Sequence, residues 1–342
     1  MKRFRLLIQL LVLVGCGLVV YLLFHPELFV GSSDVSEKPP QMTDAVQHDL
    51  SDPALLIRPK YRSSIDCGQR TPQALALAGD QLVVAYRRLN LVDFFDEAGQ
   101  RLVFFDPFPR GEMNISSLYV DDQGQLYIND FANRTLLMFD EGRNFLQVFP
   151  RGQESGASRP QLPVSISGSD KLLVIADLGD NTVKSYLPNG EYVLSLSQEA
   201  SGIPESWHPF DVALTDDGRI LVSDIQGKQV LAFSCAGKFA YAFAEPEEGN
   251  GPQKPGAMAI DSLGRVHLVD SGSHQIFVYD NFGRFLFTYG RPGSIGTGMR
   301  VPTAIAIDTE NDLVYIADSG NRQIDVWSLP KNTPQYIMLL TP

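Results

Sequence analysis

Short apolar runs alternate with clusters of turn residues from about residue 70 to residue 340, and this pattern repeats along the chain. The last repeat reads TAIAID (303–308), LVYIAD (313–318), QIDVW (323–327) and YIMLL (336–340). Runs rich in β-branched and aromatic residues between turn residues are typical of β-strands. Because none of the runs extends into a longer amphipathic stretch, a helical array is excluded. The pattern therefore predicts an all-β fold with four strands in each repeat.

An acidic marker fixes the length of the repeat. The second run of a copy ends in Asp130, Asp177, Asp224, Asp270 or Asp318, while Tyr86 stands at this place in the first copy. Successive markers are 44, 47, 47, 46 and 48 residues apart. Units this small cannot bury their own faces, so a regular period indicates one array. Four antiparallel strands form a propeller blade, and the repeat predicts a six-bladed β-propeller.

The first strand of each copy is expected to lie nearest the central axis, where space is tight. Alignment of the copies places these residues at one inner position: Ala76, Tyr119, Ser165, Ala213, Ala259 and Ala306. All are small except Tyr119, which we expect to occupy the central channel. The strand that closes the ring stays open at this stage. Residues 61–67 (YRSSIDC) and 336–340 (YIMLL) compete for it, or both lie side by side.

Several copies carry a recognisable motif. ADSGNRQIDVW (317–327) resembles the hallmark of NHL repeats, and VDSGSHQIFVYD (269–280) and NDFANRTLLMFD (129–140) resemble it less closely. The resemblance covers residues 65–340, whereas the first, third and fourth copies depart from the motif. NHL repeats form six-bladed propellers, so the resemblance implies the same fold as the count of copies.

The N-terminus predicts a membrane anchor. Residues 6–24 are apolar apart from Gln9, which is long enough to span a bilayer core. Lys2, Arg3 and Arg5 precede this run and acidic residues follow it, so the positive-inside rule sends the rest of the chain across the membrane. We therefore expect a cytoplasmic stub (1–5), a transmembrane signal anchor (6–24), a flexible tether (25–60) and a periplasmic propeller (61–342), held at the inner membrane.

Two other interpretations of the N-terminus place the propeller on the same side. Leu13-Val14-Gly15-Cys16 matches a bacterial lipobox, which predicts a lipoprotein anchored at Cys16. A cleaved secretory signal is the third alternative. In the tether, Leu55–Ile57 are the residues that could instead pack on the side of the propeller.

Composition excludes one class of partner. The formal net charge is −12, so the surface would repel nucleic acid phosphates, although some NHL propellers bind RNA. Outside the apolar N-terminal run the cysteines are Cys67 and Cys235. Their copies lie two blades apart, so we expect two free thiols. The chain has no CxxCH or CxxC motif, and no cofactor or metal is predicted.

Residues that recur at the same position of each copy divide into those expected to support the fold and those that could bind a partner. The strand-ending aspartates recur at one position, which is typical of side chains that cap turns by accepting backbone hydrogen bonds. Four residues after each marker the copies carry Asn90, Arg134, Asn181, Lys228, His274 and Arg322. The loops between second and third strands should bring these residues to one face. Two interpretations are open. These residues either form a cationic site for an anionic ligand or acidic partner segment at the end of the channel, or they are common to repeats of this kind and pair with nearby aspartates.

The first copy breaks the pattern, with Tyr86-Arg87-Arg88 at the marker, and the connections between blades add Trp207-His208 to the same face. Loops on a rigid scaffold often carry binding residues. The predicted binding face therefore comprises Arg87, Arg88, Arg134, Trp207, His208, Lys228, His274 and Arg322.

The leading hypothesis is a membrane-tethered scaffold that binds another envelope protein or a peptide. The alternative is a metal-dependent hydrolase or lyase with a site at the channel mouth. His208 and His274 lie on adjacent copies, but a catalytic zinc site needs a third ligand that the sequence does not obviously supply. Asp211 is the inner-strand acid that could hold a channel cation.

Overall fold

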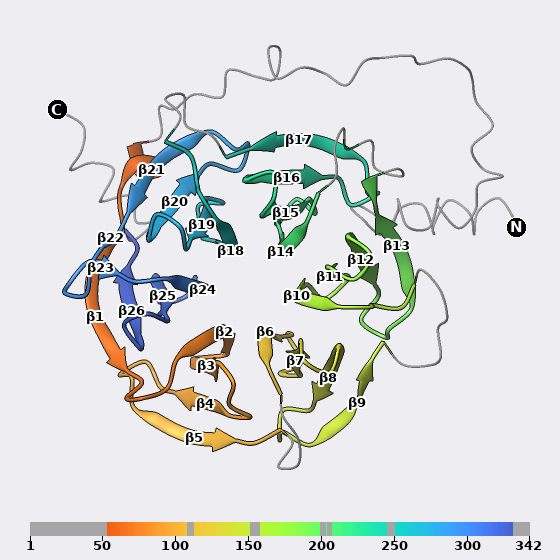
Figure 1. Cartoon of the computed structure of the whole chain (residues 1–342), viewed down its shortest axis with the longest axis horizontal. Coiled ribbons are helices and arrows are strands. Elements are labelled where there is room, and N and C mark those ends of the chain that lie inside the picture. The colour runs from red at the N-terminus through yellow and green to blue at the C-terminus, as the bar shows by residue number, and fades with distance from the viewer. Residues whose placement is uncertain are drawn as a thin grey trace, which may run out of the picture.

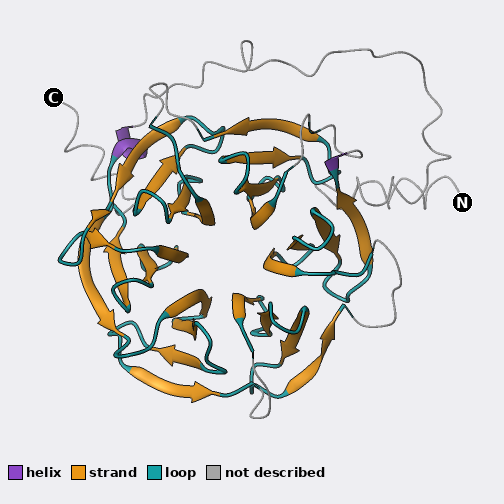
Figure 2. Ribbon diagram, in the orientation of Figure 1, coloured by secondary structure: helices purple, strands orange, loops and turns teal. Residues whose placement is uncertain are grey.

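A computed structural model describes residues 53–107, 113–150, 158–198, 203, 207–244 and 250–330. Within these ranges, six four-stranded sheets surround a central axis (Figures 1 and 2). The all-β, six-bladed propeller that the sequence predicts is confirmed. Residues 1–52, with the expected stub, membrane span and most of the tether, lie outside the described residues, as do residues 331–342. In the described part of the chain, no helix has the length and apolar character to cross a membrane.

The blades follow one another in chain order, each running from the innermost to the outermost strand. Blade 1 contains β2 (Pro72–Ala78), β3 (Gln81–Tyr86), β4 (Val92–Phe95) and β5 (Arg101–Phe105). Blade 2 contains β6 (Ile115–Val120), β7 (Leu126–Asp130), β8 (Thr135–Phe139) and β9 (Phe145–Phe149). Blade 3 contains β10 (Pro163–Gly168), β11 (Leu173–Asp177), β12 (Thr182–Tyr186) and β13 (Tyr192–Leu196).

The second half of the ring repeats this order. Blade 4 contains β14 (Pro209–Leu214), β15 (Ile220–Asp224), β16 (Gln229–Phe233) and β17 (Phe239–Phe243). Blade 5 contains β18 (Pro255–Ile260), β19 (Val266–Asp270), β20 (Gln275–Tyr279) and β21 (Phe285–Tyr289). Blade 6 contains β24 (Pro302–Asp308), β25 (Leu313–Asp318), β26 (Gln323–Ser328) and β1 (Lys60–Asp66). A short parallel pair, β22 (Arg291–Pro292) and β23 (Gly298–Met299), lies in the connection from blade 5 to blade 6.

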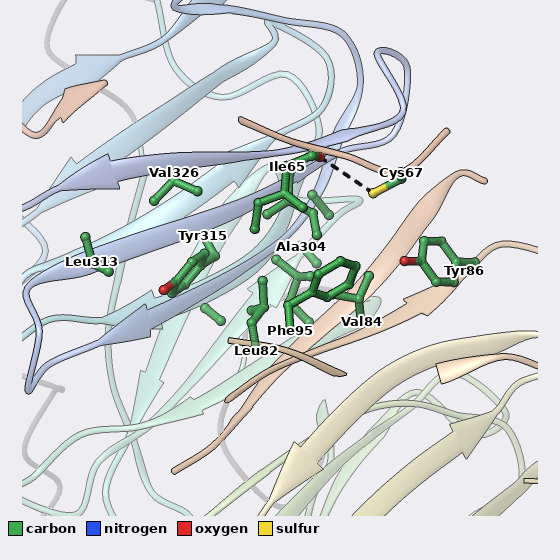
Figure 3. Packing of buried hydrophobic residues seen from close by; sticks show 14 residues of the cluster. Ile65, Cys67, Leu82, Val84, Tyr86, Phe95, Ala304, Leu313, Tyr315 and Val326 are labelled. Atoms are coloured by element: carbon green, nitrogen blue, oxygen red, sulfur yellow. Dashed lines mark hydrogen bonds between the residues drawn. The ribbon is translucent and has the colours of Figure 1, made fainter. Parts of the chain in front are cut away.

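The N-terminal strand closes the ring. β1 pairs antiparallel with β26, with Ile65 opposite Ile324. This pairing gives the place beside β26 to the N-terminal strand, because β26 has β25 on one side and β1 on the other. Residues 336–340, the other strand that the sequence offered, lie outside the described residues. Ile65 and Cys67 pack into the core cluster between blades 6 and 1 (Figure 3). The ring is therefore held shut by a strand from the opposite end of the chain.

The residues just before β1 contact blade 5. A 3-10 turn, η2 (Pro53–Leu56), precedes β1, and the Arg265 guanidinium donates to the carbonyl oxygens of Leu55 (3.3 Å) and Ile57 (2.8 Å). Arg58 donates to the carbonyl of Thr288 on β21 at 2.8 Å. The described end of the expected tether thus packs on the propeller, as the sequence allowed for Leu55–Ile57.

A register shift follows the first residue of every inner strand, and that residue is proline in all blades but the second. Proline suits this position because it has no N–H to give to the ladder. Counting four residues on from Pro163 gives Ser167, not Ser165, as the equivalent of Ala213. The sequence alignment of blade 3 was wrong by two residues, since SISGS offers a small side chain at either position.

Candidate binding face

The two faces of the ring differ in the loops that form them. The upper face, as we define it, holds the hairpins between second and third strands and the connections between blades. The lower face holds the hairpins between first and second and between third and fourth strands. This follows from the antiparallel order of strands in every blade.

The upper hairpins present basic side chains at a conserved backbone position of the repeat. In these hairpins one residue takes a left-handed conformation with φ between 52° and 59°; these residues are Arg88, Arg134, Asn181, Lys228, His274 and Arg322. The sequence placed Asn90 in this series for the first copy, and the structure places Arg88 there, because the first hairpin reaches its left-handed residue sooner. Arg87, Arg88, Arg134, Lys228 and Arg322 are all exposed.

The connections between blades add further cations to the upper face. Among the described residues, the exposed ones are Arg159, Lys254, Arg291 and Arg300, against the exposed acids Asp66 and Asp106. Within the described chain no ion pair engages Arg134, Lys228 or Arg88, whereas Arg322 donates to the side-chain oxygen of Gln69 at 2.7 Å. His274 is less available, because its Nδ1 accepts a hydrogen bond from the backbone N–H of Val301 at 3.0 Å.

Trp207 does not lie at the surface as the sequence led us to expect, and His208 is only partly exposed. Trp207 is 2% exposed and packs against Phe233 in the core between blades 3 and 4. His208 is half-buried, its backbone N–H donates to Asp224 at 3.0 Å, and its Nδ1 has no partner in the described structure. The apolar packing of the blade connection explains why the tryptophan is drawn inward.

The lower face carries the opposite charge. Its hairpins contain the following acidic residues: Asp80, Asp96, Glu97, Asp121, Asp122, Asp140, Glu141, Asp170, Glu191, Asp216, Asp217, Asp261, Asp280, Asp308, Glu310 and Asp312. The basic residues of these hairpins are fewer. Lys171 and Lys238 are exposed and Arg143 is half-buried, while Arg219, Arg265 and Arg284 form ion pairs with Asp217, Asp261 and Asp280. The described upper face is therefore mainly cationic and the lower face mainly anionic.

The strand-ending aspartates are buried and hold the upper loops in place. Asp270 accepts hydrogen bonds from the backbone N–H groups of Gln253 (2.9 Å) and Lys254 in the incoming connection, and of Ser273 (3.1 Å) in its own hairpin. Asp130 likewise accepts from Asn114 and Ala132 at 3.1 Å. Each carboxylate thus joins a hairpin to a blade connection. The sequence predicted the hairpin half of this role and missed the connection.

In the first copy a buried cluster replaces the marker. Tyr86 donates its hydroxyl to Asp93 at 2.8 Å, and Arg70 forms an ion pair with the same carboxylate. The Arg70 guanidinium also stacks over the Tyr86 ring, 4.6 Å from its centre. Burial raises the pKa of the neighbouring Cys67 to about 12, so this thiol stays protonated. Cys67 and Cys235 are both free. No sequence signal pointed to Asp93, which lies within an ordinary strand pattern.

The central channel is a cavity of about 940 Å³ lined by the inner strands of all six blades. Its wall includes Ser116, Ser167 and Thr303, and its charged residues are Asp211, Asp216 and Asp261. Tyr119 lines the cavity, and its ring lies 5.7 Å from that of Tyr127 on the same blade. The upper cations are therefore not continued into the channel.

Asp211 links three blades across the channel wall. Its carboxylate accepts hydrogen bonds from the Ser165 hydroxyl in blade 3 and from the Met258 backbone N–H in blade 5, the latter at 2.6 Å. Burial raises the pKa of Asp211 to about 6, although the hydrogen bonds that its carboxylate accepts act in the opposite direction. Among the described residues, no three His, Cys, Asp or Glu side chains gather as ligands for a metal ion. These contacts give Asp211 a role in holding blades 3, 4 and 5 together.

Solved structures share this fold. A streptogramin B lyase has a TM-score of 0.57 at 13% identity, covering 80% of this chain and 97% of that chain. Selenomethionine-substituted virginiamycin B lyase from Staphylococcus aureus has a TM-score of 0.58 at 11% identity, covering 80% and 100%. A catalytically inactive virginiamycin B lyase from the same organism, with quinupristin, has a TM-score of 0.57 at 13% identity, covering 80% and 99%.

These likenesses show the propeller fold and, at such low identity, no more than the fold. No protein-family model and no curated protein matches the chain.

Proposed function

We propose that this protein is a binding module of the bacterial envelope whose upper face captures an acidic segment of another protein. The observation that supports this is the separation of charge between the two faces among the residues that the structure describes. A chain with a formal net charge of −12 exposes Arg87, Arg88, Arg134, Lys228 and Arg322 together on one face. Because these guanidinium and ammonium groups are solvated and mostly unpaired, an acidic partner gains their attraction at little desolvation cost.

Charge of one sign on a face steers a partner of the opposite sign and orients it before contact. The anionic lower face repels the same partner, so an acidic segment approaches from above. The binding is passive and needs neither a cofactor nor a metal. We propose that the NHL-like repeats supply the rigid ring, and that the apolar residues 6–24 anchor it in the inner membrane with the ring on the periplasmic side. Protease digestion of intact spheroplasts, which reaches only that side, tests the topology.

The binding proposal is tested with the full chain in detergent and a fluorescent peptide rich in glutamate. The variant Arg134→Glu/Lys228→Glu reverses two exposed upper cations that form no ion pair. We expect it to weaken peptide binding about tenfold, from losing roughly 0.7 kcal/mol at each site. Binding to the unaltered protein should weaken above 0.15 M salt, where charges further apart than about 8 Å are screened.

A matched variant separates the face from the overall charge. Lys171→Glu/Lys238→Glu makes the same change in net charge on the lower face and should leave binding unaltered. Equal losses in the two variants would contradict the proposal. Stoichiometric metal in the purified protein, lost on His208→Ala or Asp211→Ala, would instead favour the metal-dependent hydrolase or lyase.

A further inference from the structure

The outermost strand of blade 1 exposes apolar side chains along an unpaired edge. In β5, Leu102, Val103 and Phe104 are 50%, 37% and 65% exposed. Within the described chain β5 pairs only with β4, so its outer backbone groups face away from the sheet. Outer strands differ in this respect: β9 in blade 2 also exposes Phe145, Leu146 and Val148 (49%, 46% and 46%), whereas every residue of β13 in blade 3 is at least half-buried. An apolar open edge is a template for another strand.

The neighbouring edge in blade 6 is protected in a different way. The exposed residues of β1 are Lys60, Arg62, Ser63, Ser64 and Asp66, which are all polar or charged. Charged side chains on an edge strand oppose the addition of an apolar strand. Of these two adjacent edges, the one on β5 is therefore the better match for an apolar partner.

We infer that the C-terminal segment Tyr336–Leu340 (YIMLL) adds to β5 as a fifth strand of blade 1. This segment has a strand pattern and no place in the six four-stranded blades, because both sides of β26 are filled by β25 and β1. Its alternating side chains would place one set beside Leu102 and Phe104 and the other beside Val103. The unpaired apolar edge and the unplaced apolar strand thus complement each other.

The end of the described chain lies close to the start of β5. The Leu329 N–H donates to the Asp312 carbonyl at 2.7 Å on the lower face. The adjacent Asn311 side chain donates to Glu97 at 2.8 Å, and Glu97 belongs to the turn that leads into β5. Gly99 in the same turn lies against the Ile65 side chain of β1.

The length of the chain permits this docking. Residues 331–335 can extend about 17 Å, which suffices for a step from this corner to the neighbouring strand. The segment would then run from the lower to the upper face, parallel to β5. A covalent link also gives the segment a millimolar effective concentration, which favours it over a second molecule.

Hydrogen exchange measured by mass spectrometry tests the inference, by comparing the full chain with a chain that ends at Pro330. We expect backbone amides of residues 101–105 to exchange at least tenfold faster in the shortened chain, while those of residues 60–66 stay unchanged. Ile337→Asp/Leu339→Asp in the full chain should have the same effect, and Thr341→Asp should have none.

Three results would overturn the inference. Exchange in residues 101–105 could be equal in the two chains, which would leave the edge open. Faster exchange could appear in residues 60–66 instead, which would place the segment on β1. Backbone amides of residues 101–105 in the shortened chain could become better protected from exchange as the protein concentration rises. That result would make the partner of β5 a second copy of the chain.

Discussion

Asp270 shows how a single carboxylate sets the shape of the upper face. It is fully buried and accepts backbone N–H groups from both its own hairpin and the incoming connection. Backbone N–H groups in such a place need an acceptor, because an unpaired buried donor costs about 1–3 kcal/mol. The carboxylate is therefore a structural link, and the exposed cations beside it are left free to contact a partner.

Removal of this carboxylate should destabilise the ring. We expect Asp270→Ala to lower the free energy of unfolding by roughly 2–4 kcal/mol, because several buried donors lose their acceptor. Asp80→Ala, at an exposed lower hairpin, should change it by less than about 0.5 kcal/mol. Urea unfolding followed by fluorescence measures both variants. Similar values for the two would argue against the link between hairpin and connection.

The burial of Asp325 leads us to expect that the stability of the folded protein depends on pH. It is fully buried, its Oδ2 has no partner, and burial and then the nearby Asp318 charge raise its pKa to about 7. The folded protein then keeps the proton up to about pH 7, whereas the unfolded chain releases it near 3.8. The stability from this group is therefore present at acidic pH and lost as the pH rises, by about 1.4 kcal/mol per unit.

Asp325→Asn removes this ionisation while keeping the shape of the side chain. We expect the variant to melt at a higher temperature than the unaltered protein at pH 8, with the difference shrinking as the pH falls below 7 and closing near pH 3.8. Thermal unfolding at several pH values measures this, with Asp80→Asn as the control that shows no such trend. A difference independent of pH would mean that Asp325 is ionised throughout.

At the scale of elements, the joint between β1 and blade 1 explains the broken marker. Tyr86 donates to Asp93 and lies under Arg70, in the short connection from the closing strand to β2. The other blades use an aspartate to hold the incoming connection, and blade 1 uses this Tyr–Asp–Arg cluster. In blade 1 the incoming connection is therefore still held to the blade, but by different residues.

Replacing Tyr86 by the aspartate that the other blades carry should lower the stability of the fold. We expect Tyr86→Asp to destabilise the fold by roughly 3 kcal/mol or more, because it places a second carboxylate beside buried Asp93 and removes an aromatic ring from the core. Tyr86→Phe keeps the ring and should cost about 1–2 kcal/mol through the lost hydrogen bond. Chemical unfolding ranks the two, and a neutral Tyr86→Asp would show that the cluster has no structural role.

At the scale of the whole molecule, the closed ring sorts the charges of its described residues onto two faces. Acidic turns such as DEAG (96–99) and DDQG (121–124) look locally like ordinary turn sequences, because aspartate and glycine favour turns. The arginines of the upper hairpins also look, in the sequence, like residues that simply recur at one position of the repeat. Only the closed ring places one set above and the other below. The proposed capture of an acidic segment belongs to this scale, since no single hairpin carries it.

The sequence by itself determined the number of blades, the four strands in each and the recurring aspartates, because these depend on local patterns repeated every 44 to 48 residues. It could not choose between two possible closing strands, since both have the same strand pattern and pairing depends on distant neighbours. It also could not foresee that Trp207 is buried or that Asp93 meets Arg70. Tertiary structure decided these points, because burial and ion pairing arise only when segments far apart in the chain are packed together.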